Sequence, residues 1–176
     1  DGERGLPFYH NEYECKFPFL PAFLEETGFR QVILNLAINA RDAIERNGRI
    51  KIRLRKVKKG EDIMVGASGK PRKAPNHGAE ISLSDNGKGI PVEIEEKLFD
   101  PFFTTKESSS GSGFGLYNTK LFIEDHKGEI GFSSEMGKGS VFYLFLPLAI
   151  DEEDDDDMRT KRMRRATREF IKTRKR

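Results

Sequence analysis

Hydrophobic and polar residues follow two different periods along this chain, and each period predicts one type of element. Residues 29–46 (FRQVILNLAINARDAIER) place apolar side chains three and four positions apart, which predicts a helix. We expect Thr27 or Gly28 to precede that helix, and Asn47 with Gly48 to stop it. Residues 49–57 (RIKIRLRKV) instead alternate isoleucine and leucine with basic residues, which predicts a half-solvated strand.

The second half of the chain continues this mixture of strands and helices. Apolar alternation predicts strands at 80–85 (EISLSD), 129–134 (EIGFSS) and 140–148 (SVFYLFLPL). Two helices are predicted, at 91–99 with a proline in its first turn and at 115–126. Because the strands are joined by tight turns and the helices are grouped, we expect an α+β fold. It would be a two-layer α/β sandwich, with a mixed, mostly antiparallel sheet covered on one face by helices.

Three less regular segments divide the chain. Residues 1–27 contain several prolines and are expected to be irregular, with a possible short strand at 13–17 (YECKF). Residues 58–79 are rich in glycine, lysine and proline, which is typical of a mobile loop. We therefore expect one folded domain at 28–149, followed by a charged tail or linker, disordered or helical, at 150–176.

Composition narrows the class of protein. A chain of 176 residues is long enough for one domain with its own core. The single Cys15 excludes an internal disulfide and a cysteine-only metal site, which suits a reducing compartment. No apolar run approaches the roughly 20 residues that a membrane helix needs. The chain starts at Asp1 rather than at a methionine, which favours a fragment of a longer protein.

The net charge of +2 conceals two opposite blocks at the end of the chain. Residues 151–157 (DEEDDDD) are all acidic, and residues 158–176 carry ten lysines and arginines against one glutamate. Such blocks are usually solvated. A linker towards a neighbouring domain is the simpler interpretation, and a nucleic-acid or membrane contact of the basic block is the alternative.

One face of the first predicted helix carries candidate chemistry. Gln31, Asn35, Asn39, Asp42 and Arg46 follow one another at intervals of three or four residues and therefore form one stripe. Amide oxygens are hard, neutral ligands that suit Mg²⁺, which keeps waters and phosphate oxygens beside few protein ligands. The alternative is a polar helix face that simply meets water.

Two glycine-containing stretches are also candidates. In SDNGKGI (84–90), Asp85 follows a buried strand, and Gly87 and Gly89 leave the backbone without side chains. That pattern fits a ligand lying on the backbone, or merely an Asp-Asn-Gly turn. In GSGFGLYNTK (111–120), three glycines lead into a helix whose first N–H groups can bind an anion, although a flexible linker explains them equally well.

A phenylalanine-rich stretch lies between those two. In LFDPFFTTK (98–106), the side chains of Phe99, Phe102 and Phe103 could all belong to the core. Lys106 follows them and could reach a terminal phosphate or remain solvated.

Taken in order, these stretches resemble the catalytic, ATP-binding domain of sensor histidine kinases. That domain belongs to the superfamily shared with gyrase, the heat-shock ATPase chaperones and the mismatch-repair ATPases. QVILNLAINARDAI resembles its asparagine box, DNGKGI its first glycine box, FDPFFTTK its phenylalanine box, and GSGFGLYNTKLFIEDHKGEI its second glycine box. GKGSVFYLFLP resembles its closing strand pair, so the resemblance covers residues 29–148 and implies a Bergerat-type ATP-binding fold.

The resemblance implies how the base of ATP would be bound. Asp85 would accept a hydrogen bond from the adenine amino group, and Ser140 would share a water network with that carboxylate. Gly87 and Gly89 would let the base lie against the backbone, with Ile90 beside it.

It also implies a magnesium and phosphate site. Asn39 would coordinate Mg²⁺, with Asn35 and Asp42 facing the same site. Residues 104–113 would form the ATP lid, and Lys106 would neutralise phosphate charge. The remaining expected contacts are Phe103 and the N–H groups of Gly113, Phe114, Gly115 and Leu116.

Position 35 separates branches of the superfamily, because the ATPase branches carry a glutamate there that activates water. Asn35 cannot accept a proton, which favours phosphoryl transfer to a protein acceptor over hydrolysis. None of His10, His77 and His126 lies in a phosphoacceptor motif, so the acceptor histidine is expected on a separate dimerisation domain.

The resemblance thus implies a histidine-kinase catalytic domain in two-component signalling, with ATP and Mg²⁺ as cofactors. Its partners would be the dimerisation and phosphoacceptor domain of the parent kinase and a response regulator or receiver domain, with no nucleic acid. Its location would be cytoplasmic, including as the cytosolic part of a membrane-bound sensor. The alternatives are a serine/threonine kinase or anti-sigma-type regulator of the same superfamily, a non-catalytic ATP-binding or scaffold module, and a hydrolysing ATPase.

Overall fold

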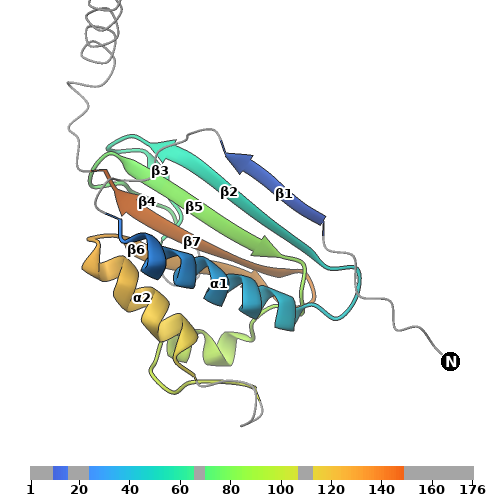
Figure 1. The fold of residues 1–176 in the computed structure, drawn as a ribbon. Coiled ribbons are helices and arrows are strands. Elements are labelled where there is room, and N and C mark those ends of the chain that lie inside the picture. Colours follow the sequence, from blue (N-terminus) through green and yellow to red (C-terminus); the bar gives the residue numbers. More distant parts are fainter. Residues whose placement is uncertain (1–9, 16–23, 66–69, 107–112, 149–176) are drawn as a thin grey trace, which may run out of the picture.

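The computed structural model describes residues 10–15, 24–65, 70–106 and 113–148, and these form one α+β unit (Figure 1). Its main sheet has five strands in the order β1-β2-β5-β7-β6. Their bounds are β1 His10–Cys15, β2 Arg49–Val57, β5 Gly78–Asp85, β6 Glu129–Glu135 and β7 Gly139–Pro147. Only the β1–β2 pair is parallel, so the expected mixed, mostly antiparallel sheet is confirmed.

Two helices lie side by side on one face of this sheet (Figure 1). They are α1 (Glu26–Ala43) and α2 (Gly115–Asp125), and a short 3₁₀ helix, η2 (Val92–Lys97), follows β5. Alternate residues of the strands point towards the helices because side chains change face at every position of a strand. The fully buried core between the two layers includes Val32, Leu36, Leu83, Ile123, Phe132 and Leu144.

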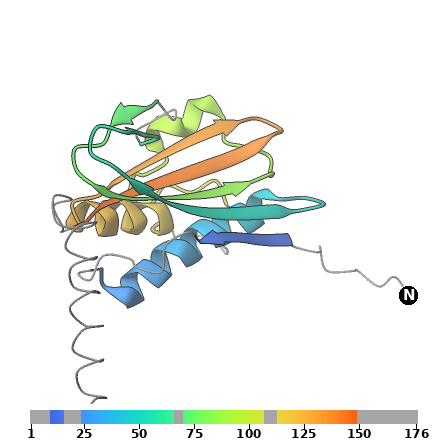
Figure 2. The ribbon, with the colours of Figure 1, turned by 90° about the horizontal axis from the view of Figure 1, so that it is seen from above.

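A small hairpin covers part of the opposite face of the sheet (Figure 2). It consists of β3 (Asp62–Ile63) and β4 (Arg72–Lys73), which pair antiparallel. Beneath it lies a second apolar cluster, made of Val57, Ile63, Val65, Ala74 and Phe145. The expectation of a mobile loop throughout 58–79 is therefore wrong for its described parts, because short apolar residues within the polar sequence are buried against Phe145.

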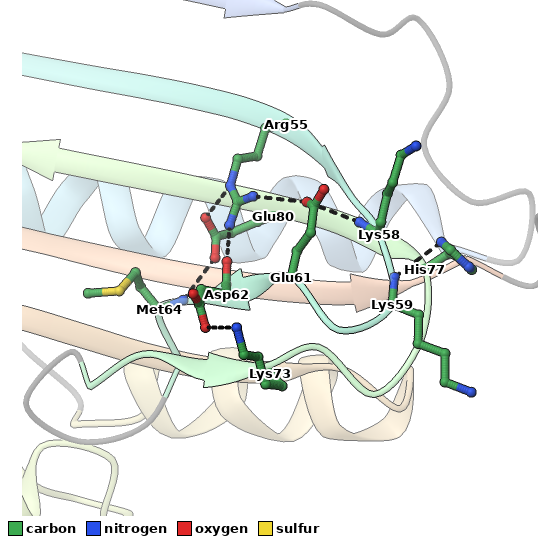
Figure 3. Close-up of polar contacts among 9 residues, drawn as sticks. All are labelled: Arg55, Lys58, Lys59, Glu61, Asp62, Met64, Lys73, His77 and Glu80. Atoms are coloured by element: carbon green, nitrogen blue, oxygen red, sulfur yellow. Dashed lines mark hydrogen bonds and ion pairs between the residues drawn. The ribbon is translucent and has the colours of Figure 1, made fainter.

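Charged side chains fix this hairpin to the sheet (Figure 3). Glu80 of β5 is only 6% exposed, and its carboxylate accepts from Arg55 Nε at 2.8 Å and from the backbone N–H of Met64 at 2.9 Å. Arg55 also donates to the Asp62 carbonyl at 2.6 Å. The hairpin is thus held by a buried acid whose hydrogen bonds are satisfied, as burial of a charge requires.

The first helix differs from the sequence prediction at both ends. It begins at Glu26, because the carboxylate of Glu25 caps it by accepting from the N–H groups of Thr27 at 2.9 Å and Gly28 at 2.5 Å. It ends at Ala43, whose carbonyl accepts from the Lys88 N–H at 2.9 Å. A contact between distant segments therefore ends the helix before the Asn47 and Gly48 signal is reached.

Candidate functional site

The polar stripe of α1 lies where α1 meets the start of α2. Gln31 donates from Nε2 to Asn35 Oδ1 at 2.8 Å, and Asn35 donates from Nδ2 to the Gly115 carbonyl at 3.1 Å. Both ends of the Asn35 amide are therefore engaged, and the side chain is oriented towards the first turn of α2. Arg46, predicted to extend this stripe, lies beyond the end of the helix, so that part of the prediction is wrong.

One helical turn further on, Asn39 and Asp42 both contact the ammonium group of Lys106. The ammonium of Lys106 lies 3.2 Å from Asn39 Oδ1 and 2.6 Å from Asp42 Oδ2. Arg41 holds the other carboxylate oxygen, with Nε 2.8 Å from Asp42 Oδ1. Partial burial alone would raise the pKa of Asp42, but the hydrogen bonds from Lys106 and Arg41 outweigh it and leave that pKa lowered.

Asp85 lies at the other end of the site, at the last position of β5 and on its helix-facing side. Its Oδ1 accepts from two backbone N–H groups, of Gly87 at 2.8 Å and of Ser140 at 3.3 Å. Neither a cation nor a hydrogen-bond donor contacts Oδ2 from within the described residues. Burial raises the pKa of the Asp85 carboxyl, and the two N–H groups offset this only in part.

A pair of hydroxyl groups adjoins Asp85. Ser140 is 4% exposed, and its Oγ lies 3.1 Å from the Oγ of Ser134. Ser134 in turn accepts from the Ile90 N–H at 2.8 Å. Sequence reasoning missed Ser134, although the Gly-Lys-Gly turn at 137–139 could have revealed it, because a tight hairpin places Ser134 opposite Ser140.

The glycines near Asp85 have a packing role in addition to the expected contact with the base, which stays a prediction. A Cβ on Gly87 would come within 2.6 Å of the Ala43 carbonyl oxygen, and one on Gly89 within 2.4 Å of the Glu135 carbonyl oxygen. Gly89 also has a positive φ of 79°. Both glycines therefore let the loop after β5 pack closely against other backbone, which fixes the position of Asp85.

The first turn of α2 presents backbone N–H groups that have no partner within the helix. Phe114 occupies the N-cap without a capping side-chain hydrogen bond, and the first turn carries no acidic residue. The first backbone bond of the helix runs from the Asn118 N–H to the Phe114 carbonyl at 2.8 Å. The preceding N–H groups of Gly115, Leu116 and Tyr117 point along the helix axis, an arrangement that attracts anions.

The phenylalanine-rich stretch divides into core and surface. Phe99 packs against Phe132, with ring centroids 6.0 Å apart, and Phe103 is half-buried. Phe102 is 72% exposed, so the interpretation in which all three phenylalanines belong to the core does not hold for it. It adopts a positive φ of 65° and places its ring edge-on to Phe114, with centroids 4.6 Å apart.

The remaining predicted site residues lie beside the main core or in the segment that leads into α2. Ile90 and Leu116 are half-buried at the margin of the main core. Gly113 has a φ of 70°, and a Cβ there would lie 2.4 Å from the Phe102 carbonyl carbon. Of the expected lid at 104–113, residues 107–112 lie outside the described residues.

Along α1, these groups form one continuous row. Asn35 touches the start of α2, Asn39 and Asp42 follow, and Ala43 contacts the loop after Asp85. From position 35 to position 43 the helix rises about 12 Å. The row therefore offers an acceptor at one end, a cation site in the middle and helix N–H groups at the other end.

Comparison with known proteins identifies this arrangement. Residues 24–150 match the family described as histidine kinase-, DNA gyrase B-, and HSP90-like ATPase. The chain belongs to this family. It is 40% identical over 129 residues to the sensor kinase CckA of Brucella abortus (strain 2308), and 37% identical over 119 residues to the histidine-protein kinase AtoS of Escherichia coli (strain K12).

These relatives are much longer than the matched region. The alignments cover 73% and 68% of this chain but only 13% and 16% of CckA and AtoS. Among solved structures, the catalytic domain of the histidine kinase ThkA superposes with a TM-score of 0.56 at 29% identity, covering 79% of this chain and 77% of that one. The chain is thus a histidine-kinase-type catalytic domain. No described helix is long and apolar enough to cross a membrane.

Proposed function

We propose that this domain binds ATP with Mg²⁺ and supplies the γ-phosphate to a histidine on a separate dimerisation domain of its parent kinase. The observation that carries the proposal is the Asp85 carboxylate. It is fixed by two backbone N–H groups on Oδ1, while Oδ2 accepts from no described residue. Asp85 is half-buried, so Oδ2 stays open to a donor from a ligand, and the adenine amino group would supply that donor.

The other end of the row suits the phosphates. The N–H groups at the start of α2 are uncapped by a side chain, and Lys106 brings a positive charge to the same row. A helix N-terminus and a flexible ammonium are both common phosphate ligands. Lys106, Gly113, Phe114, Gly115 and Leu116 are therefore our candidates for the phosphate contacts, with Phe103 adjoining them.

Magnesium fits between these two ends. The described residues contain no group of three His, Cys, Asp or Glu side chains that could hold a metal by themselves. Mg²⁺ needs only one or two protein oxygens when phosphate oxygens and water complete its shell. Asn39 Oδ1 would be its protein ligand, with Asp42 close by; the bound ion would neutralise phosphate charge.

Asn35 supports transfer rather than hydrolysis. Its amide has no proton-accepting group, and its two ends are already occupied by Gln31 and by the Gly115 carbonyl. Asn35 would position the start of α2 and leave water without a base. Catalysis would then rest on positioning and on charge neutralisation by Lys106 and the metal.

The parent protein would supply the partners. We propose a phosphoacceptor and dimerisation domain in the same kinase, a response regulator or receiver domain downstream, and a cytoplasmic site of action, where ATP is available. Within that longer chain the expected boundary at 28 would move towards the N-terminus, because β1 and the start of α1 belong to the folded unit, and the charged segment at 150–176 would follow the domain.

Calorimetric titration with a non-hydrolysable ATP analogue tests nucleotide binding. We expect binding that is strengthened by Mg²⁺, and much weaker binding of the matching GTP analogue. No binding by the folded chain would leave a scaffold module as the better interpretation.

The acceptor is tested on the full-length parent kinase with labelled ATP. Phosphohistidine is lost in acid and survives base, whereas phosphoserine survives acid. Acid-labile label on the dimerisation domain is the expected result; acid-stable label on a partner protein would establish the serine-kinase alternative instead.

A further inference from the structure

The carboxylate of Asp42 is saturated by two cationic side chains. Arg41 holds Oδ1 through Nε at 2.8 Å and a terminal nitrogen at 2.7 Å, while the Lys106 ammonium lies 2.6 Å from Oδ2. The same ammonium is 3.2 Å from Asn39 Oδ1. The ammonium of Lys106 therefore sits between the amide oxygen of Asn39 and Oδ2 of Asp42.

We propose that Lys106 is an internal counter-cation, which a divalent cation must displace in order to bind at Asn39 and Asp42. The proposal rests on the function proposed above. Asp42 is then a positioning residue, which keeps Lys106 beside α1 until the divalent cation arrives. Once displaced, Lys106 is free to contact the phosphates, so that arrival of the cation and delivery of the lysine charge are linked.

The two cations cannot share these oxygens. Repulsion between a divalent ion and an ammonium at contact distance is twice that between two single charges, and the described surroundings add the Arg41 guanidinium as a third cation. Asn39 and Asp42 are three residues apart on a continuous helix and cannot separate. Displacement must therefore move the lysine.

Lys106 is built to move. Its ammonium is carried on a flexible four-carbon stem, and its side chain and that of Asp42 are each 29% exposed, so solvent and ions reach the pair. A partly exposed ion pair of this kind is weak enough to be exchanged. It is also strong enough to hold the lysine in place when nothing competes.

The test is a titration with Mn²⁺ in the absence of nucleotide, followed by NMR as paramagnetic broadening of the Asn39 side-chain amide and of the backbone amides around Asp42. Broadening detects binding in the millimolar range that such a small ligand set implies. We expect Lys106→Met to bind Mn²⁺ about three- to fivefold more tightly than the wild-type chain, because the competing charge is gone. In Lys106→Met/Asp42→Asn, that gain should be lost.

Lys120→Met is the matched control. Lys120 lies on α2, and its ammonium is 3.8 Å from the carboxylate of Glu124. Its substitution by methionine removes one positive charge, as Lys106→Met does, but at a position that does not contact Asn39. Equal Mn²⁺ affinity in the wild-type chain and Lys106→Met overturns the proposal, as does an equal gain in Lys120→Met. Because no nucleotide is present, the result is independent of ATP binding: loss of ATP binding alone would remove the proposed function and leave the cation exchange standing.

Discussion

Two acids on the same strand, Glu80 and Asp85, are five residues apart and so lie on opposite faces of the sheet. Glu80 faces the β3–β4 hairpin, and each of its oxygens has a donor, Arg55 Nε on one and the Met64 N–H on the other. Asp85 faces the helix layer, and both of its donors bind the same oxygen. Both carboxylate oxygens of Glu80 therefore accept hydrogen bonds, whereas only Oδ1 of Asp85 does so among the described residues.

The surroundings of the two acids differ in kind as well. Glu80 is held by a long arginine side chain and by the hairpin that it anchors (Figure 3). Asp85 is held by backbone alone, at a point where Gly139 packs directly on the Asp85 carbonyl. The flexible Arg55 side chain can adjust its position to keep its contact with Glu80, which stabilises the fold. Backbone contacts instead hold Asp85 in one position, which suits the binding of a ligand.

The largest expected effect comes from disturbing the backbone around Asp85. A Cβ on Gly139 would lie 2.0 Å from the Asp85 carbonyl oxygen, at a φ of 115°. Gly139→Ala should therefore lower the free energy of unfolding by about 2–4 kcal/mol and abolish nucleotide binding. Urea unfolding and calorimetry measure both quantities.

Gly137→Ala provides the matched control for that substitution. Gly137 lies in the same turn at a φ of 76°, but nothing lies within 4 Å of a Cβ there. Gly137→Ala should lower the free energy of unfolding by only about 1 kcal/mol, because alanine disfavours a positive φ, and nucleotide affinity should be unchanged. Equal effects of the two substitutions would contradict the proposed role of the Gly139 contact.

Asp85→Asn tests the role of Asp85 Oδ2, the oxygen that accepts from no described residue. The asparagine Oδ1 can still accept from the Gly87 and Ser140 N–H groups, so the fold should survive. Its Nδ2 would place a donor against the adenine amino group, and loss of a charged acceptor should weaken binding of the ATP analogue by about 10- to 100-fold. The exposed Asp62→Asn on the hairpin is the control and should bind normally. Wild-type affinity in Asp85→Asn would remove Asp85 from the site.

The sequence predicted β2, β5, β6, β7, the helices α1 and α2, and the position of Asp85 at the end of a strand, because alternation and helical spacing depend on neighbours within a few residues. It placed the edge strand β1 only as a possible strand at 13–17 in an irregular segment, whereas the structure has it at His10–Cys15, and the helix expected at 91–99 is the 3₁₀ helix η2. It failed where distant segments decide. Ala43 ends α1 because Lys88 binds its carbonyl, and the β3–β4 hairpin forms because Phe145 and Glu80 lie beneath it.

The same limit applies to the site. The spacing of Asn35, Asn39 and Asp42 predicted one stripe, and the structure brings Lys106 onto it from 64 residues away. That Gly87 and Gly89 meet backbone rather than open space could not be read from a glycine pattern, which is the same for a ligand contact and for a close packing contact.

Glu80→Gln should have a smaller effect, confined to stability. The amide keeps one acceptor and loses the ion pair with Arg55, whose side chain is 42% exposed and can turn to water. We expect a loss of about 1–2 kcal/mol in the free energy of unfolding, with nucleotide affinity unchanged. Glu61→Gln, which removes the looser 3.7 Å contact with Arg55, is the control and should cost less. A change in nucleotide affinity in Glu80→Gln would show that the two faces are coupled.

The smallest expected effect is on the pH dependence of stability, and it has a definite sign. Burial raises the pKa of Asp85, so between the ordinary aspartate pKa of about 3.9 and the raised value the folded chain binds more protons than the unfolded chain. Stability contributed by Asp85 therefore falls as pH rises through that window. Asp85→Asn lacks this loss, so in urea titrations it should gain stability relative to the wild-type chain as pH rises above about 4.

Asp42 does not obscure this comparison. Its pKa is lowered, despite the opposing effect of burial, by hydrogen bonds from Lys106 and Arg41, so its contribution to stability is lost as pH falls. Asp42 is present in both the wild-type chain and Asp85→Asn, and its effect cancels in their difference. A difference that stayed constant with pH would mean that the pKa of Asp85 is the same in the folded and unfolded chain, which would contradict the expected effect of its burial.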